Sequence, residues 1–176
     1  MDINNVKKII RTIPDYPSQG IIFRDLTTIF KDKNSIKYLS DLLYETYRNK
    51  GITKVLGIES RGFIMGAILA TKINAGFIPI RKKGKLPAEI FSESYEKEYG
   101  TDTLEIHKDA LCKNDIVLIH DDILATGGTL QAAYKLVEKF HVEKIYVNFI
   151  AELCELNGRQ ILGEKIVKET ISFIQF

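Results

Sequence analysis

Two adjacent carboxylates, Asp121 and Asp122, directly precede a run of small residues in the segment VLIHDDILATGGTL (117–130). Small residues at a helix start leave backbone N–H groups open, and unpaired amides at this positive terminus bind phosphate. Adjacent acids repel phosphate unless they bind hydroxyl groups or a divalent metal ion. The stretch therefore favours a sugar phosphate with a vicinal diol, and the alternative is a solvated strand end before a glycine turn. The phosphate-binding positions in this hypothesis are Ala125, Thr126, Gly127, Gly128 and Thr129.

The commonest nucleotide-binding loops do not occur in the sequence. Neither GxxxxGK[ST] nor GxGxxG is present, and the segment 125–129 lacks the lysine of a Walker loop. A nucleoside triphosphate site and a dinucleotide site are therefore poor explanations of this stretch.

A second charged stretch, RKKGK at 81–85, places four cations around one glycine. Alone it would be a solvated basic loop or a nucleic-acid-binding patch. Beside a phosphate site it favours a second, more highly charged anion such as pyrophosphate. In ESRGF (59–63), Arg61 opens a predicted helix, where an anion is also favourable, and a surface ion pair is the alternative.

Two further residues have ordinary explanations on sequence grounds alone. Phe23 in IIFRD lies between aliphatic residues and a charged pair, which favours core packing. Glu98 lies between Lys97 and Tyr99 and is by default one more solvated charge.

The charged stretches follow segments that have the pattern of strands. Strands alternating with helices indicate a mostly parallel α/β sheet, and such sheets bind ligands outside the carboxyl ends of their strands. The charged stretches would then meet at one edge of the sheet. The predicted strands are 54–60, 76–80, 115–120 and 144–150, and the helices that follow two of them are 62–73 and about 128–140.

The N-terminal part has a helical pattern. Apolar residues from Ile3 to Ile13 fall at helical spacing, with Asp2 as the predicted N-cap. The segment PDYPSQG (14–20) breaks that helix, and IIFRDLTTIF follows as a short extended stretch and a turn. A second helix is predicted over 36–47.

Length and composition indicate one soluble domain of 176 residues. The segment 86–113 is charged and tyrosine-rich, and we predict a lid containing a small hairpin. The net charge of +2 excludes a global nucleic-acid footprint, and neither a membrane span nor a signal segment is visible. Cys112 and Cys154 match no metal or redox spacing, which favours a reduced cytoplasmic chain. The basic, amphipathic N-terminal stretch leaves a transit peptide as an alternative.

The segment VLIHDDILATGGT resembles the phosphoribosyl-pyrophosphate (PRPP) motif of the type I phosphoribosyltransferases. The resemblance covers the chain from about Thr12 to Phe176 in the family's order and spacing. It implies an α/β fold with a mostly parallel twisted sheet flanked by helices, a small N-terminal hood (about 1–33) and a long flexible lid loop (about 86–113). Other stretches narrow the resemblance to the adenine-specific members: GIIFRDLTTIF, GIESRGFIMG, PIRKKGKLP, SYEKEYGTDTLEIHKDAL and GRQIL.

The resemblance implies a Mg²⁺-dependent purine-salvage enzyme that transfers the 5-phosphoribosyl group from PRPP to adenine, giving AMP and pyrophosphate. The transition state would be oxocarbenium-like. The family also implies a homodimer, with no nucleic-acid or membrane partner. Two alternatives stay open: a phosphoribosyltransferase for hypoxanthine, guanine or xanthine, and a non-catalytic PRPP-binding regulator, which the low net charge and short N-terminal segment disfavour.

The resemblance also assigns roles for PRPP at matching positions. Residues 125–129 would bind the 5-phosphate through backbone amides and hydroxyls. Asp121 and Asp122 would bind the ribose hydroxyls, directly or through water and a Mg²⁺ held mainly by PRPP. An unusual peptide geometry is expected near Ser60, and in family dimers Arg81 reaches into the neighbouring site. The positions implied for pyrophosphate are Glu59, Ser60, Arg61, Arg81, Lys82 and Lys85.

For the base, the resemblance points to IIFRD and to the lid. Phe23 would stack on the purine, and the main chain of Ile22 and Arg24 would read its Watson–Crick edge. Glu98 would take the N7 proton as the third catalytic residue beside the two aspartates, with Tyr99 covering it.

Two residues depart from the family pattern. His120 stands where an apolar strand residue is usual, and it is expected to affect packing beside the diol-binding acids. Glu59 stands where some relatives have aspartate, which is a smaller change.

Overall fold

A computed structural model of the chain describes residues 1–96 and 100–176. The chain forms two compact units, Met1–Thr46 and Tyr47–Phe176. Among the described residues, no helix has the length and apolar character needed to span a membrane.

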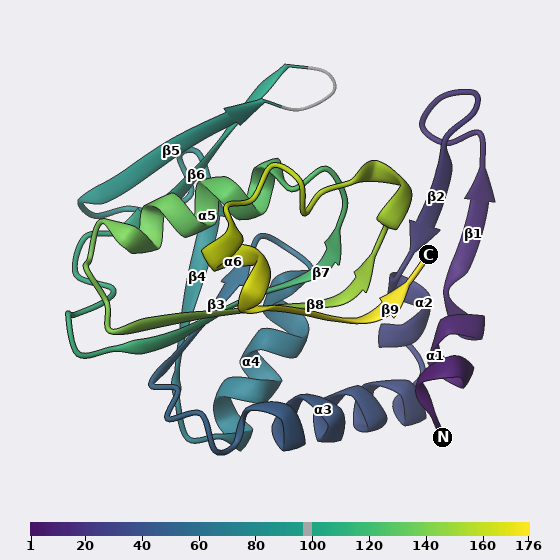
Figure 1. Cartoon of the computed structure of the whole chain (residues 1–176), viewed down its shortest axis with the longest axis horizontal. Coiled ribbons are helices and arrows are strands. Elements are labelled where there is room, and N and C mark those ends of the chain that lie inside the picture. The colour runs from purple at the N-terminus through teal and green to yellow at the C-terminus, as the bar shows by residue number, and fades with distance from the viewer. Residues whose placement is uncertain (97–99) are drawn as a thin grey trace. The chain divides into compact units, whose positions relative to one another are not determined.

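The first unit consists of helices and a two-stranded antiparallel sheet (Figure 1). Asp2 caps the first helix as predicted, because its side chain accepts a hydrogen bond of 2.8 Å from Asn5 N. The prediction that helical spacing continues to Ile13 is wrong: the helix ends at Ile9, and Ile13 pairs with Phe23 in the sheet. The elements are α1 (Ile3–Ile9), β1 (Arg11–Pro14), β2 (Ile22–Asp25), α2 (Thr27–Phe30) and α3 (Lys33–Tyr47).

The second unit contains a seven-stranded, mostly parallel sheet, which confirms the predicted fold class. The strand order is β5-β6-β4-β3-β7-β8-β9, and only the pairs β5–β6 and β4–β6 are antiparallel. The strands are β3 (Lys54–Ile58), β4 (Gly76–Lys82), β5 (Ile90–Glu96), β6 (Thr101–His107), β7 (Ile116–Leu124), β8 (Lys144–Glu152) and β9 (Thr170–Gln175).

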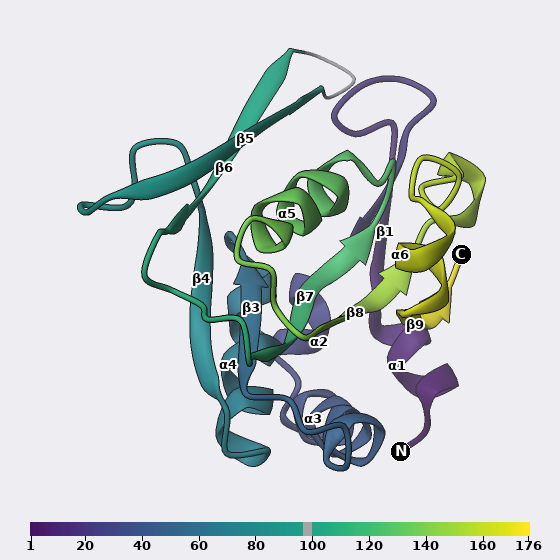
Figure 2. The same cartoon turned by 60° about the vertical axis from the view of Figure 1, so that its left-hand side comes forward.

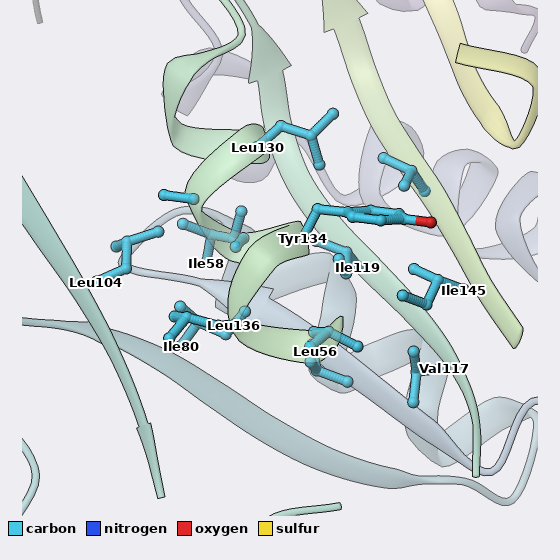
Figure 3. Close-up of a cluster of buried hydrophobic side chains, with 14 of the residues drawn as sticks. Leu56, Ile58, Ile80, Leu104, Val117, Ile119, Leu130, Tyr134, Leu136 and Ile145 are labelled. Carbon is cyan, nitrogen blue, oxygen red and sulfur yellow. The ribbon is translucent and has the colours of Figure 1, made fainter. Parts of the chain in front are cut away.

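Helices α4 (Gly62–Lys72) and α5 (Gly128–Glu138) lie on opposite faces of this sheet (Figures 1 and 2). The core lies under α5, where Leu130, Tyr134 and Leu136 pack on strand residues such as Leu56 and Ile119 (Figure 3). Two shorter helical segments, η1 (Cys154–Leu156) and α6 (Glu164–Lys168), follow β8. Burial of this apolar surface is the main force that holds the strand ends in place.

One strand boundary differs from the sequence pattern in a way that matters for the site. Strand β7 continues past His120 to Leu124, because its pairing with β8 persists as far as Leu124 and Glu152. Both aspartates therefore lie inside the strand and not after it. The segment 86–113 contains the β5–β6 hairpin, as predicted, and this hairpin packs on α5.

Candidate active site

A pocket of about 240 Å³ opens at the carboxyl edge of the parallel strands. Its walls come from the ends of β3, β4, β7 and β8, from β5, and from the start of α5. This is the edge at which open α/β sheets bind ligands. The lining residues are Glu59, Ser60, Arg61, Lys82, Tyr95, Asp121, Asp122, Ile123, Leu124, Ala125, Thr126, Gly127, Thr129, Leu130 and Phe149.

One wall of the pocket is the turn from β7 into α5, which we call the phosphate loop (residues 125–129). Helix α5 begins at Gly128, and its N-cap, Gly127, has a left-handed φ of 88° and provides no side-chain cap. The first-turn amides of α5 are therefore not occupied by a capping side chain, and the helix dipole makes this end positive. The loop has the form of an anion site.

The glycine at 127 is required by space as well as by φ. A Cβ on Gly127 would lie 2.3 Å from the carbonyl oxygen of Gly158. A Cβ on Gly158 would in turn lie 2.1 Å from the carbonyl oxygen of Ala125. Both distances are far below van der Waals contact, so the two backbone segments approach as closely as only glycine allows.

The acid pair lies beside the loop on β7. Asp122 is 1% exposed, and its Oδ2 is 2.9 Å from Arg61 Nε, an ion pair that lacks hydrogen-bond alignment. Asp121 is partly buried, and its Oδ1 accepts a hydrogen bond of 2.8 Å from Asp122 N. A Cβ on Gly62 would lie 3.0 Å from Asp121 Oδ1, so α4 begins directly against these acids.

Burial and mutual repulsion make this acid pair hard to ionise. Burial raises the pKa of Asp121 well above its ordinary value, and the neighbouring negative charge of Asp122 raises it further. Burial also raises the pKa of Asp122, although the Arg61 guanidinium opposes the shift. A ligand that donates hydroxyl groups or brings a cation would relieve both costs.

The opposite wall carries the positive charge. Arg61 immediately precedes α4, and the peptide bond between Glu59 and Ser60 is cis, the unusual geometry expected there. Glu59 accepts hydrogen bonds from Arg81 Nε (3.0 Å) and Lys82 N (2.8 Å). Burial raises the pKa of Glu59, but these two bonds outweigh it and hold that pKa below its ordinary value. Glu59 therefore orients the Arg81 guanidinium and the Lys82 backbone as an ionised carboxylate, while the Lys82 ammonium lies 3.5 Å from Asp102 Oδ2.

Most of the predicted PRPP positions meet in this one pocket, but not all predicted site residues do. Arg81, Lys85 and Gly128 are not among its lining residues. The base-binding positions 22–24 lie in β2 of the first unit. Glu98 and Tyr99 lie outside the described residues.

Sequence reasoning missed two aromatic residues of the pocket, Tyr95 and Phe149. Phe149 is buried in β8 in register with Asp121, so the parallel pairing of β7 with β8 brings it to the site. The ring of Tyr95 lies near the start of α5, since its Cδ2 would be 3.4 Å from a Cβ on Gly128. The tyrosine-rich character of the segment 86–113 was the only signal for Tyr95.

The donor set fits a metal ion that arrives with its substrate. Among residues 1–96 and 100–176, no cluster of three or more His, Cys, Asp or Glu side chains could hold an ion alone. Mg²⁺ is usually bound by one or two carboxylates together with substrate phosphates. Asp121 and Asp122 would provide those carboxylates, and Asp122 Oδ2, which is ion-paired with Arg61, is a buried oxygen with no aligned hydrogen-bond donor among the described residues.

His120, the residue that departs from the family pattern, is fully buried on the α4 face of β7. Its Nδ1 is 2.9 Å from Oδ1 of Asn148, its register partner on β8. Asn148 Nδ2 donates to Ile171 O at 3.3 Å, so its Oδ1 accepts and the neutral imidazole carries its proton on Nδ1. Burial lowers the pKa of His120 to about 4. The hydrogen bond with Asn148 raises this pKa, but its effect is smaller.

Replacing His120 by leucine is expected to make the free energy of unfolding less sensitive to acid. The pKa is about 6.5 in the unfolded chain and about 4 in the folded one, so only the unfolded state gains a proton as pH falls from 6.5 to 4. The wild type should lose up to about 3 kcal/mol over this range relative to His120→Leu. Urea unfolding at pH 7, 5.5 and 4.5 measures this difference.

The matched control is His141→Asn, at an exposed position, which should follow the wild type at every pH. If the free energy of unfolding fell equally with pH in the wild type and in His120→Leu, the assignment of a neutral buried imidazole would be contradicted.

The fold and the pocket together define a phosphoribosyltransferase. The family described as "Phosphoribosyl transferase domain" matches residues 25–173, which is most of the chain.

Individual relatives show to which subgroup of this family the chain belongs. The chain is 62% identical over 164 residues to an adenine phosphoribosyltransferase of Bacteroides thetaiotaomicron, covering 93% of each chain. It matches the structure of the Giardia lamblia APRTase complexed with 9-deazaadenine at a TM-score of 0.94 and 41% identity, covering 100% of this chain and 98% of that one. An adenine phosphoribosyl transferase of Trypanosoma brucei, in complex with AMP, pyrophosphate and ribose-5-phosphate, matches at a TM-score of 0.88 and 26% identity, covering 98% and 79%. The chain belongs to the phosphoribosyltransferase family, and within it to the adenine phosphoribosyltransferases.

Proposed function

We propose that the pocket binds PRPP and that the chain transfers its 5-phosphoribosyl group to adenine, which gives AMP and pyrophosphate in purine salvage. The observation that carries the proposal is the arrangement on β7 and α5. An acid pair, with Asp122 buried and Asp121 partly buried, is followed along one strand–helix unit by an uncapped helix start, and Arg61 lines the same pocket. The acid pair thus matches a diol, the phosphate loop matches a phosphate, and the wall with Arg61 matches a second anion.

The proposed contacts follow the chemistry of each wall. The phosphate loop binds the 5-phosphate through the amides and hydroxyls of residues 125–129. Asp121 and Asp122 accept hydrogen bonds from the ribose hydroxyls. The pyrophosphate group lies against Ser60, Arg61 and the basic stretch 81–85, with Glu59 orienting the Arg81 guanidinium and the Lys82 backbone.

Base recognition is assigned to β2 in the first unit. Phe23 is half-buried, and its ring packs edge-to-face on Tyr16 with centroids 5.2 Å apart. A held aromatic ring of this kind can stack on a purine. The main chain of Ile22 and Arg24 would read the Watson–Crick edge, where a carbonyl oxygen accepts from the 6-amino group of adenine.

The chemistry proposed is displacement at the anomeric carbon through an oxocarbenium-like transition state. Asp121 and Asp122 stabilise the positive charge that develops on the ribose, and the cations of the opposite wall stabilise the departing pyrophosphate. A Mg²⁺ ion bound with PRPP would neutralise part of the phosphate charge. The segment 86–113 acts as a lid that excludes water from the activated sugar.

Replacing Glu98 by glutamine is expected to lower kcat by about 10²-fold with little change in KM for adenine. The carboxylate takes the N7 proton as N9 attacks, and a positioned base contributes about 10²- to 10⁴-fold. Steady-state rates from pH 5 to 9 measure the effect, and the acid limb of the wild-type profile should disappear. A wild-type pH–rate profile in Glu98→Gln would place the proton transfer elsewhere.

The proposal extends to organisation. All 176 residues act as one phosphoribosyltransferase domain, with the hood at about 1–33 and the lid at about 86–113. The functional form is a homodimer, and Arg81, whose guanidinium also lies 5.8 Å from the Phe63 ring, reaches toward the neighbouring site. Cys112 and Cys154 are exposed free thiols, which supports a reducing cytoplasmic location.

Incubation with PRPP, Mg²⁺ and a panel of purine bases tests the function. Pyrophosphate release should occur with adenine and be at least 10²-fold slower with hypoxanthine, guanine and xanthine, since the site pairs a specific exocyclic group. Release with another purine instead would reassign the base, and release with none would contradict the enzymatic function.

A further inference from the structure

A segment that contributes no lining residue to the pocket supports the phosphate loop. We call residues 153–162 the buttress; it begins after β8 and includes η1. Leu153 N donates to Leu124 O at 2.9 Å, and Gln131 Nε2 donates to Ile161 O at 3.1 Å. The buttress is therefore bonded to β7 before the phosphate loop and to α5 after it.

The closest approach is between glycines. Gly158 is buried, and its carbonyl oxygen would be 2.3 Å from a Cβ on Gly127. The position of Gly158 thus limits where the backbone of the phosphate loop can lie. A loop whose function depends on the direction of its amides needs such a fixed support.

Arg159, the next residue, anchors the buttress to the sheet. Its Nε and Nη2 donate to the two carboxylate oxygens of Glu152 at 2.8 and 2.7 Å. Its Nη1 donates to Thr170 O at 3.1 Å, and its Nη2 also reaches Ser172 Oγ at 3.3 Å. Paired planar groups of this kind give strong and geometrically specific bonds.

The carboxylate of this ion pair is withdrawn from solvent, while Arg159 is partly exposed. Glu152 ends β8 and is 6% exposed. The Arg159 bonds hold the pKa of Glu152 below its ordinary value despite burial, so the carboxylate is ionised in the folded chain. Removal of Arg159 would leave Glu152 as an uncompensated buried charge, which is costly.

We propose that Arg159 is a positioning residue for PRPP: its bidentate bond to Glu152 holds Gly158 against the phosphate loop and so sets the affinity for the 5-phosphate. Arg159 is not among the residues that line the pocket, so it acts through the backbone of Gly158. The inference rests on the proposed function, because it requires that residues 125–129 bind the 5-phosphate.

Replacing Arg159 by methionine, which keeps the length of the side chain, tests the proposal. KM for PRPP should rise by about 10- to 100-fold, while kcat and KM for adenine change by less than about threefold. In calorimetry, the Kd of ribose 5-phosphate should rise by the same factor as KM, and the Kd of pyrophosphate should stay unchanged. A purely structural role would not separate these two ligands.

Two further variants keep the test decisive. Glu152→Gln retains the shape of the side chain and loses its charge, so it should raise the Kd of ribose 5-phosphate in the same direction even if Arg159→Met does not fold. Lys144→Met breaks the 3.6 Å pair with Glu169 at the other end of β8 and should change neither Kd.

The outcomes separate the two claims. A wild-type protein that binds neither ribose 5-phosphate nor PRPP would contradict the proposed function. A wild-type protein that binds both, with Arg159→Met and Glu152→Gln weakening ribose 5-phosphate and pyrophosphate equally or not at all, would overturn the role of Arg159 alone.

Discussion

Replacing Asp122 by asparagine is expected to lower kcat by about 10³-fold. The carboxylate is nearly inaccessible to water and lies 2.9 Å from Arg61, so its charge acts in a low-dielectric site on the cation that develops at the ribose. An amide of the same shape retains hydrogen-bonding capacity but supplies no negative charge. Steady-state and single-turnover rates with adenine and PRPP measure the loss.

The free energy of unfolding should change far less than the rate. Burial raises the pKa of Asp122, which means that the folded chain disfavours this charge, and asparagine removes that cost. Arg61 is about a third exposed and stays solvated without its partner. Asp41→Asn, which removes the exposed 2.9 Å pair with Lys37, is the matched control and should leave kcat unchanged. Unchanged turnover in Asp122→Asn would remove the assignment of the diol-binding acids.

Replacing Gly127 by alanine is expected to raise KM for PRPP by more than about 10²-fold. The residue has φ of 88°, which is unfavourable for alanine by about 1 kcal/mol or more, and its Cβ would lie 2.3 Å from Gly158 O. The loop must therefore move, and its amides no longer converge on one phosphate. Binding of ribose 5-phosphate by calorimetry measures the effect apart from catalysis.

Gly20→Ala separates backbone strain from the steric clash. Gly20 has a similar φ of 86°, but a Cβ there would meet nothing within 4 Å. The free energy of unfolding of this variant should fall by about the strain energy expected for alanine at position 127. Its affinity for ribose 5-phosphate should stay unchanged. Wild-type affinity in Gly127→Ala would show that the loop does not bind the 5-phosphate.

The chemistry of the phosphate loop and the acid pair was predictable because it is local. Asp121, Asp122 and residues 125–129 are neighbours in sequence, and one strand followed by one helix is enough to bring them together. Most of the parallel sheet was predictable for a similar reason, since β3, β4, β7 and β8 each carry an apolar pattern, but β9 was not among the predicted strands. Helix α1 shows the limit of such patterns: spacing extended it to Ile13, but pairing with β2 ends it at Ile9.

The contacts that support the site are long-range, and local patterns do not reveal them. His120 binds Asn148 only because β7 and β8 pair in parallel at that register. Gly158 meets Gly127 although α5 and β8 lie between them in the sequence, and Arg159 bonds Thr170 and Ser172 beyond α6. The segment GRQIL marked family resemblance in the sequence, but its physical role emerges only from these distances.

The most direct test of the central claim is a crystal structure of the protein with Mg²⁺, ribose 5-phosphate and pyrophosphate. The account predicts the 5-phosphate within hydrogen-bond distance of the amides of residues 125–129. It also predicts the ribose hydroxyls on Asp121 and Asp122, and pyrophosphate against Ser60 and Arg61. A 5-phosphate bound away from the phosphate loop, or a ribose that does not contact the acid pair, would contradict it.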